Sequence, residues 1–170
     1  MLVLRGTQKL LKDLRLKKTD LSESGDGALG SWFANLFWIE RRKCVLITND
    51  QTLYSVLLFG LTKPDFDTLD TRFRDGLIAN LRRDGFPPEQ IASLAMALNP
   101  SVWSVTNSRS VLGSMNDMIL TAKYLVAIKR RETEDEIRNL NIDLNRTPMS
   151  ALKRFDAVSE MAVALEDWKP

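Results

Sequence analysis

The segment from Trp32 to Ile39 constrains the fold most, because it is apolar on both of its alternating faces except at Asn35. A strand with this pattern is covered on both sides and therefore lies inside a layered domain. After a turn at 40–42, a second strand is predicted from Lys43 to Thr48 and a third from Thr52 to Phe59. Consecutive strands joined by short turns predict an antiparallel meander, although the third segment could instead be helical.

Helical spacing of apolar residues dominates the remainder of the chain. Further strands are predicted at 2–5 and 102–106, and helices from about residue 7 and at 65–85, 88–98, 108–131, 132–144 and 156–166. The 108–131 helix carries apolar residues on two faces, one with Val111, Met115 and Ala122 and one with Leu120, Tyr124 and Ile128. We therefore predict an α+β fold over residues 1–170 as a single domain. It would have a small, mostly antiparallel sheet of about four to five strands packed against helices, with a central two-sided helix near 108–131.

The chain contains no histidine among its 170 residues, which excludes several chemistries. Neither a Ser-His-Asp nor a Cys-His site is possible, and no imidazole can bind a metal. We therefore expect no metal and no cofactor. The single Cys44 cannot form an internal disulfide, as is typical of a reducing cytosol, and no apolar run approaches a membrane span. These features predict a cytoplasmic protein without a membrane association.

Charge is unevenly distributed although the net charge is only +2. Residues 1–18 are strongly basic, and residues 132–170 carry an excess of acidic side chains. This asymmetry could mark an anionic partner, or two solvated faces that attract each other, and we favour the second interpretation. If nucleic acid is the partner, the candidate phosphate-contacting residues are Arg5, Lys9, Lys12, Arg41, Arg42 and Lys43.

The segment from Asn107 to Met118 interleaves polar residues with apolar ones at the start of the most periodic helix. Together with Asn35 in the apolar strand, it supplies the candidate binding residues, which are Asn35, Asn107, Ser108, Arg109, Ser110, Ser114, Asn116 and Asp117. In one interpretation these side chains form a closed hydrogen-bond network that locks loops to the helix. In the other, the free amides of residues 108–111 and Arg109 bind an anion at the helix start. We favour the network.

Several segments resemble the signatures of a family of uncharacterised bacterial proteins that carry a domain of unknown function. They include Trp32-Phe33-Ala34-Asn35-Leu36, Arg109-Ser110-Val111-Leu112-Gly113-Ser114-Met115-Asn116-Asp117 and Asn145-Arg146-Thr147-Pro148-Met149-Ser150-Ala151-Leu152. The resemblance covers nearly the whole chain and implies a bacterial, single-domain, intracellular protein. It implies no activity, and it gives no residue a catalytic role.

We therefore expect a non-catalytic binding or interaction module whose partner surface lies near residues 107–117 and the Asn35 strand. The partner would be another protein or a second copy of the chain. Two alternatives remain open. One is a nucleic-acid-associated protein that binds phosphates through its basic residues, with affinity that falls steeply with salt. The other is a histidine-free hydrolase or transferase that uses Asp117 with a hard cation.

Overall fold

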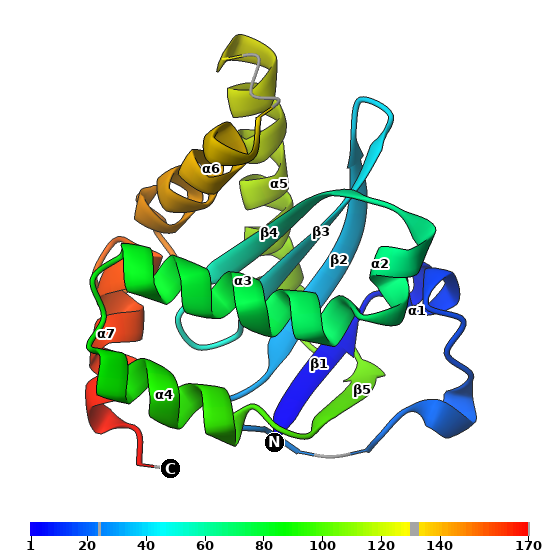
Figure 1. The fold of residues 1–170 in the computed structure, drawn as a ribbon, viewed down its shortest axis with the longest axis horizontal. Helices are drawn as coiled ribbons and strands as arrows, with labels where there is room; N and C mark the ends of the chain where they lie inside the picture. The colour runs from blue at the N-terminus through cyan, green and yellow to red at the C-terminus, as the bar shows by residue number, and fades with distance from the viewer. Residues whose placement is uncertain (24, 130–132, 170) are drawn as a thin grey trace.

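The computed structural model describes residues 1–23, 25–129 and 133–169, and it confirms the α+β class (Figure 1). Its strands are β1 (Leu2–Gly6), β2 (Trp32–Ile39), β3 (Arg42–Asn49), β4 (Ser55–Leu61) and β5 (Ser101–Val105). Its helices are α1 (Gln8–Asp13), α2 (Lys63–Asp67), α3 (Leu69–Arg83), α4 (Pro88–Ala97), α5 (Arg109–Lys129), α6 (Glu134–Arg146) and α7 (Ala157–Asp167), with a 3-10 turn at Lys18–Asp20. The predicted end of α5 at residue 131 and the predicted start of the next helix at residue 132 lie outside the described residues.

The five strands form one mixed sheet in the order β4-β3-β2-β1-β5. The meander β2–β3–β4 is antiparallel as predicted, and its third member is a strand rather than a helix. The first strand, β1, pairs in parallel with both β2 and β5. This parallel half of the sheet was not predicted, because strand periodicity indicates which faces are covered and not which strands pair.

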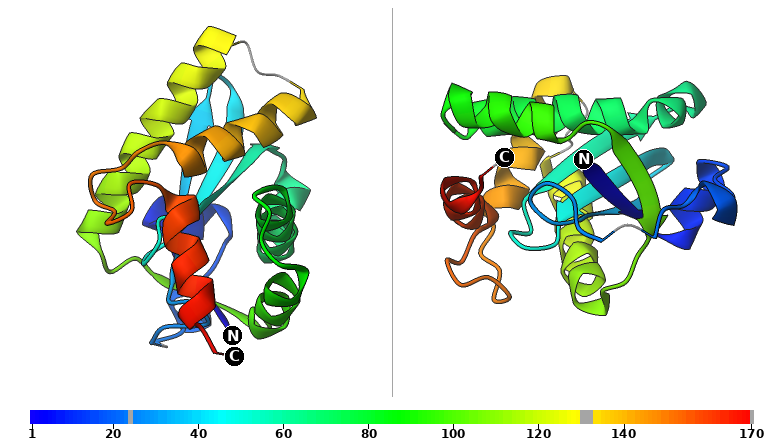
Figure 2. Two further views of the ribbon diagram at one scale, coloured as in Figure 1. Left: turned by 90° about the vertical axis from the view of Figure 1, so that its left-hand side faces the viewer. Right: turned by 90° about the horizontal axis from the view of Figure 1, so that it is seen from below.

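Helices cover both faces of the sheet, as the apolar pattern of β2 predicted (Figures 1 and 2). On one face, Trp32, Ala34 and Leu36 belong to a buried cluster that includes residues of α3, α4 and α7. On the other face, Phe33 and Phe37 belong to a second cluster with residues of α5 and α6. The alternation of side chains along a single strand therefore feeds two separate cores.

The helix α5 covers the sheet with only one of its faces, so the prediction of a two-sided helix is wrong. Met115 and Ala122 are buried against the sheet, whereas Leu120, Tyr124 and Ile128 are 65%, 64% and 58% exposed. The reason is that α5 is the outermost layer on its side of the sheet, and no described element packs beyond it (Figure 2). Its segment from Arg109 to Ile128 has the length and hydropathy of a membrane span, two properties that core helices of soluble proteins share.

The first part of the β4 edge, at Ser55 and Leu57, is paired with two asparagines of α6. The Asn145 amide nitrogen donates to the Ser55 carbonyl oxygen at 2.8 Å, and its oxygen accepts from the Ser55 backbone N–H at 2.7 Å. One helical turn earlier, Asn141 makes the same pair of bonds with the backbone of Leu57, at 3.1 and 2.8 Å. Edge strands expose unpaired backbone groups, so these side-chain amides take the place of a further strand. They fix the position of α6 and of the turn that follows it.

The predicted helix over 65–85 is interrupted at Thr68, which separates α2 from α3. The shorter helix begins with a capping box in which Thr62 donates to the Asp65 carboxylate through its backbone N–H and its hydroxyl, both at 2.7 Å. This break turns α2 toward α1 and the start of β3 (Figure 1).

Candidate functional site

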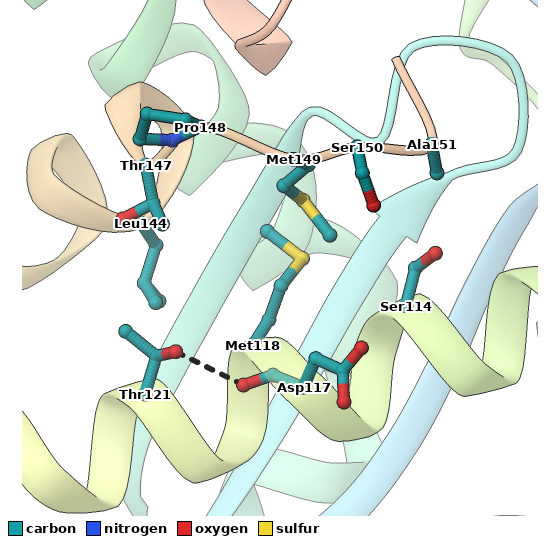
Figure 3. Close-up of a pocket in the computed structure, with 10 residues that line it drawn as sticks. All are labelled: Ser114, Asp117, Met118, Thr121, Leu144, Thr147, Pro148, Met149, Ser150 and Ala151. Carbon is teal, nitrogen blue, oxygen red and sulfur yellow. Dashed lines mark hydrogen bonds between the residues drawn. The ribbon is translucent and has the colours of Figure 1, made fainter.

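A pocket of about 200 Å³ opens between α5 and the turn that follows α6 (Figure 3). It is lined by Ser114, Asp117, Met118 and Thr121 of α5 and by Leu144, Thr147, Pro148, Met149, Ser150 and Ala151. Two of the segments that resemble family signatures, 109–117 and 145–152, therefore meet at one place on the surface.

The turn 147–151 is held in place by local hydrogen bonds rather than by regular structure. The Thr147 hydroxyl donates to the Asp143 carbonyl oxygen at 2.7 Å and so ties the end of α6. The Met149 backbone N–H donates to the Phe155 carbonyl oxygen at 2.6 Å, which closes the loop toward α7. Because Asn145 anchors the same helix end to β4, the pocket wall is joined to the sheet.

The floor of the pocket is apolar and its rim is polar. Figure 3 shows Met118 and Met149 pointing toward one another across the middle, with the Asp117 carboxylate and the Ser114 hydroxyl at the α5 side. The Ser150 hydroxyl approaches the same space from the opposite wall. Methionine side chains adapt to irregular apolar groups, and the rim offers one anionic and two neutral hydrogen-bonding groups.

The Asp117 carboxylate is exposed and forms no ion pair with any of the described residues. Its backbone oxygen accepts from the Thr121 hydroxyl at 3.0 Å, an i→i+4 bond within the helix. A carboxylate with free acceptor sites beside an apolar floor suits a cationic group on an aliphatic stem, such as a lysine or arginine side chain.

The exposed apolar side chains of α5 continue from this rim. Leu120, Tyr124 and Ile128 lie three, seven and eleven residues after Asp117, on the face of the helix that points away from the sheet. We call this set, together with Asp117, the α5 stripe. The pocket and the stripe thus form one continuous surface with a single carboxylate at their junction.

The closed hydrogen-bond network predicted for residues 107–117 is not present among the described residues. Most polar side chains of this segment are exposed, namely Asn107, Arg109, Ser110, Asn116 and Asp117. Among the described residues, Ser108 is the one whose side chain forms a hydrogen bond at the start of α5. Its hydroxyl accepts from the Val111 backbone N–H at 3.3 Å and so satisfies one of the amides proposed for anion binding.

The structure brings together only part of the predicted candidate set. Ser114 and Asp117 line the pocket, whereas Asn107, Ser108, Arg109, Ser110 and Asn116 lie outside its lining. Asn35 is half-buried on β2, where its side-chain oxygen accepts from the Thr7 hydroxyl at 3.3 Å. A buried polar network does occur at the β4 edge, in Asn80, Asn141 and Asn145, because the sheet edge needs hydrogen-bond partners there.

The basic candidates also separate. Arg5 is buried and donates to Ser31 at 2.9 Å and to Ser104 at 3.4 Å, so it joins the 25–31 loop to β5. The Lys9 ammonium lies 3.9 Å from the centre of the Trp38 ring, and Arg41 and Arg42 are exposed at the β2–β3 turn. Lys12 and Lys43 line a second hollow at the opposite end of the sheet from the termini.

The sequence predictions missed the second wall of the pocket, residues 147–151, and the asparagines of α6. A signal for the latter exists, because Asn141 and Asn145 are spaced four apart and share a helical face with Ile137 and Leu144. Amides on an apolar helical face must find buried partners. No comparable signal pairs residue 117 with residue 149.

The comparison with curated proteins finds no match for this chain. A family model does match: that of a domain of unknown function, DUF6933, over residues 3–158. This range includes the sheet except for Leu2, the α5 stripe and both walls of the pocket. Because the match covers most of the 170 residues, the chain belongs to the DUF6933 family.

Proposed function

We propose that the protein is a non-catalytic interaction module that binds a partner protein through the α5 stripe and the adjoining pocket. The observation that carries this proposal is the Asp117 carboxylate, which is exposed at the junction of an apolar stripe and an apolar-floored pocket. The partner segment would present a lysine or arginine flanked by apolar residues.

The apolar stripe is the first support for this proposal. Leu120, Tyr124 and Ile128 are each more than half exposed and follow one another at helical spacing. Single exposed apolar residues are common, but a contiguous row with a polar rim is typical of protein interaction surfaces. A partner helix or extended segment laid along α5 would cover this row.

Charge distinguishes a separate partner from a second copy of the chain. Pairing α5 with α5 would remove two Asp117 carboxylates from water, and two exposed cations of α5, Arg109 and Lys123, flank the stripe on the side away from Asp117. A partner with its own lysine or arginine would instead form a charge-assisted hydrogen bond at this position. The geometry therefore favours a basic partner over self-association.

The alternative of a carboxylate-dependent hydrolase or transferase has less support. Holding a hard cation requires several oxygen ligands. No group of three or more Asp, Glu or Cys side chains is placed to hold a metal ion in the part of the chain that the structure describes. The pocket at Asp117 contributes a single carboxylate.

The test is a selection of random peptides displayed on phage against the immobilised protein, followed by titration of the selected peptide. We expect enrichment of peptides with a basic residue beside apolar ones, and weaker binding by about tenfold or more in Asp117→Asn and Leu120→Asp. The matched controls are Asp167→Asn and Met96→Asp, which change an exposed carboxylate and an exposed apolar side chain elsewhere. These controls should bind as the wild type does.

Two results would overturn the proposal. One is a selected peptide that binds Asp117→Asn and Leu120→Asp as tightly as the wild type. The other is a dimer in sedimentation velocity that Leu120→Asp dissociates, since this outcome would assign the stripe to a second copy of the chain.

A further inference from the structure

We propose that a second site, the hollow between α1, β3 and α2, binds the phosphoryl groups of a nucleotide or a nucleic-acid strand. The hollow has a volume of about 470 Å³ and is lined by Lys12, Asp13, Leu14, Arg15, Lys43, Leu61, Lys63, Phe66 and Asp67. It shares no lining residue with the pocket at Asp117 and is independent of the interaction proposed for α5.

Four basic side chains converge on this hollow from segments far apart in the sequence. Lys12 and Arg15 come from α1 and its end, Lys43 from β3 and Lys63 from α2. The break at Thr68 and the short α2 bring the last of these beside α1 (Figure 1). The fold therefore brings together four cations from three separate segments, α1 with its end, β3 and α2.

The cations outnumber the acids around the hollow by four to two. One acid, Asp13, accepts a hydrogen bond from the Lys43 ammonium at 2.5 Å, so this pair adds little net charge and three cations face the remaining acid, Asp67. Lys12, Arg15 and Lys63 are exposed, and no ion pair involves them within the described ranges. An excess of like charge around a concave surface attracts a ligand with several negative oxygens.

The floor of the hollow is apolar, since Leu61 and Phe66 are buried beneath the cations. The Lys43 ammonium lies 5.3 Å from the centre of the Phe66 ring, and Lys9 lies over Trp38 nearby. Low-dielectric walls strengthen the field of the lysines and arginine at the opening. Phosphate suits this arrangement better than a single carboxylate because it offers three oxygens to separate donors.

The backbone conformation at Arg15 makes this residue a useful test position at the rim of the hollow. The end of α1 is a Schellman motif, with the Arg15 N–H donating to the Lys12 carbonyl and the Leu16 N–H to the Leu11 carbonyl, both at 3.1 Å. Arg15 occupies the left-handed position of this motif, with φ of 58°, where glycine is favoured. Arg15 therefore places a cation at the rim of the hollow from a backbone position that glycine would adopt with less strain.

The test measures fluorescence anisotropy of labelled single-stranded RNA, labelled single-stranded DNA and a labelled adenosine triphosphate analogue, with inorganic pyrophosphate as competitor. We expect binding at low salt that weakens steeply as salt is raised. Lys12→Gln with Lys63→Gln should weaken binding at least tenfold. The matched control, Lys153→Gln with Lys169→Gln, removes two exposed lysines outside the hollow and should change the affinity less than about threefold.

Arg15→Gly separates a binding role from a structural one. Glycine relieves the left-handed strain, so the midpoint of thermal unfolding should rise by about 2–4 °C while phosphate binding weakens. Competition by pyrophosphate would identify a small polyphosphate ligand, and binding of strands alone would identify a nucleic acid, either of which supports the site. The proposal is overturned if no probe binds at low salt, or if both lysine pairs lower the affinity equally.

Discussion

Replacing Asn145 by alanine tests whether side-chain amides hold α6 to the sheet edge. Asn145 is fully buried, and its two bonds to the Ser55 backbone are 2.7 and 2.8 Å long. Alanine leaves the Ser55 N–H without a partner and leaves its carbonyl with only a 3.5 Å contact from the Asn80 amide. One substitution therefore removes the hydrogen bond of one buried backbone group and the shorter of two hydrogen bonds of another.

The magnitude follows from these two groups. A buried donor or acceptor left unpaired costs about 1–3 kcal/mol, so both together cost about 2–6 kcal/mol. The better helix propensity of alanine returns about 0.5 kcal/mol, and the residual Asn80 contact lowers the cost at the carbonyl. We expect a loss of about 3 kcal/mol, a substantial part of the 5–15 kcal/mol typical of a domain.

The assay is urea unfolding followed by tryptophan fluorescence and circular dichroism. Asn145→Ala should lower the midpoint with little change in the slope, because the surface exposed on unfolding is nearly the same. Asn139→Ala is the matched control, since Asn139 is an exposed asparagine on the same helix. It should leave the protein equally or slightly more stable.

The reasoning is refuted if Asn145→Ala and Asn139→Ala unfold at the same midpoint. That result would mean that water satisfies the Ser55 backbone and that Asn141, Leu140 and Leu144 hold α6 without Asn145. A further check is Asn141→Ala, which removes the equivalent bonds to Leu57 and should be at least as destabilising.

Two further predictions concern a buried hydroxyl and the α5 stripe. Burial and the neighbouring Asp84 raise the pKa of Tyr54 above its usual value of 10.0, so its contribution to stability is complete below pH 10 and is lost as pH rises further. Above about pH 10 the unfolded state loses the Tyr54 proton and the folded state keeps it, which lowers the free energy of unfolding by up to about 1.4 kcal/mol per pH unit. Tyr54→Phe should therefore show a smaller decline of the urea midpoint in this pH range. Leu120→Asp should change the free energy of unfolding by less than about 1 kcal/mol, because this side chain is 65% exposed. A large loss in the same urea titration would place Leu120 in a core contact.

The sequence predicted the β2–β3–β4 half of the sheet because covered strands carry a strong local pattern. Trp32–Ile39 is apolar on both faces, and the structure places a helical layer on each. The same reasoning failed at α5. Leu120, Tyr124 and Ile128 form an apolar row that predicted a second covered face, yet the row is exposed. Periodicity shows that a face is apolar, but it does not distinguish a core from a surface that awaits a partner.

One of the two walls of the candidate site, the α5 side, could be predicted from the sequence. Polar residues within an apolar helix indicated Ser114 and Asp117, both of which line the pocket. The opposite wall, 147–151, depends on where α6 ends, and that position is set by amide bonds to Ser55 and Leu57 in a strand some 90 residues earlier. Long-range contacts of this kind leave no periodic trace in a single sequence.

Asp117 and Asn145 show how two polar residues in segments that resemble one family can differ in role. Asn145 has a complete set of backbone partners, so its chemistry is used within the fold. Asp117 is exposed within a helix and has no ion-pair partner among the described residues, and aspartate is less favourable there than alanine by about 0.5 kcal/mol. Asp117→Ala should therefore leave the thermal midpoint unchanged or slightly raised in differential scanning calorimetry. If instead the protein loses more than about 1 kcal/mol, Asp117 serves the fold, and the partner surface on α5 must be sought without it.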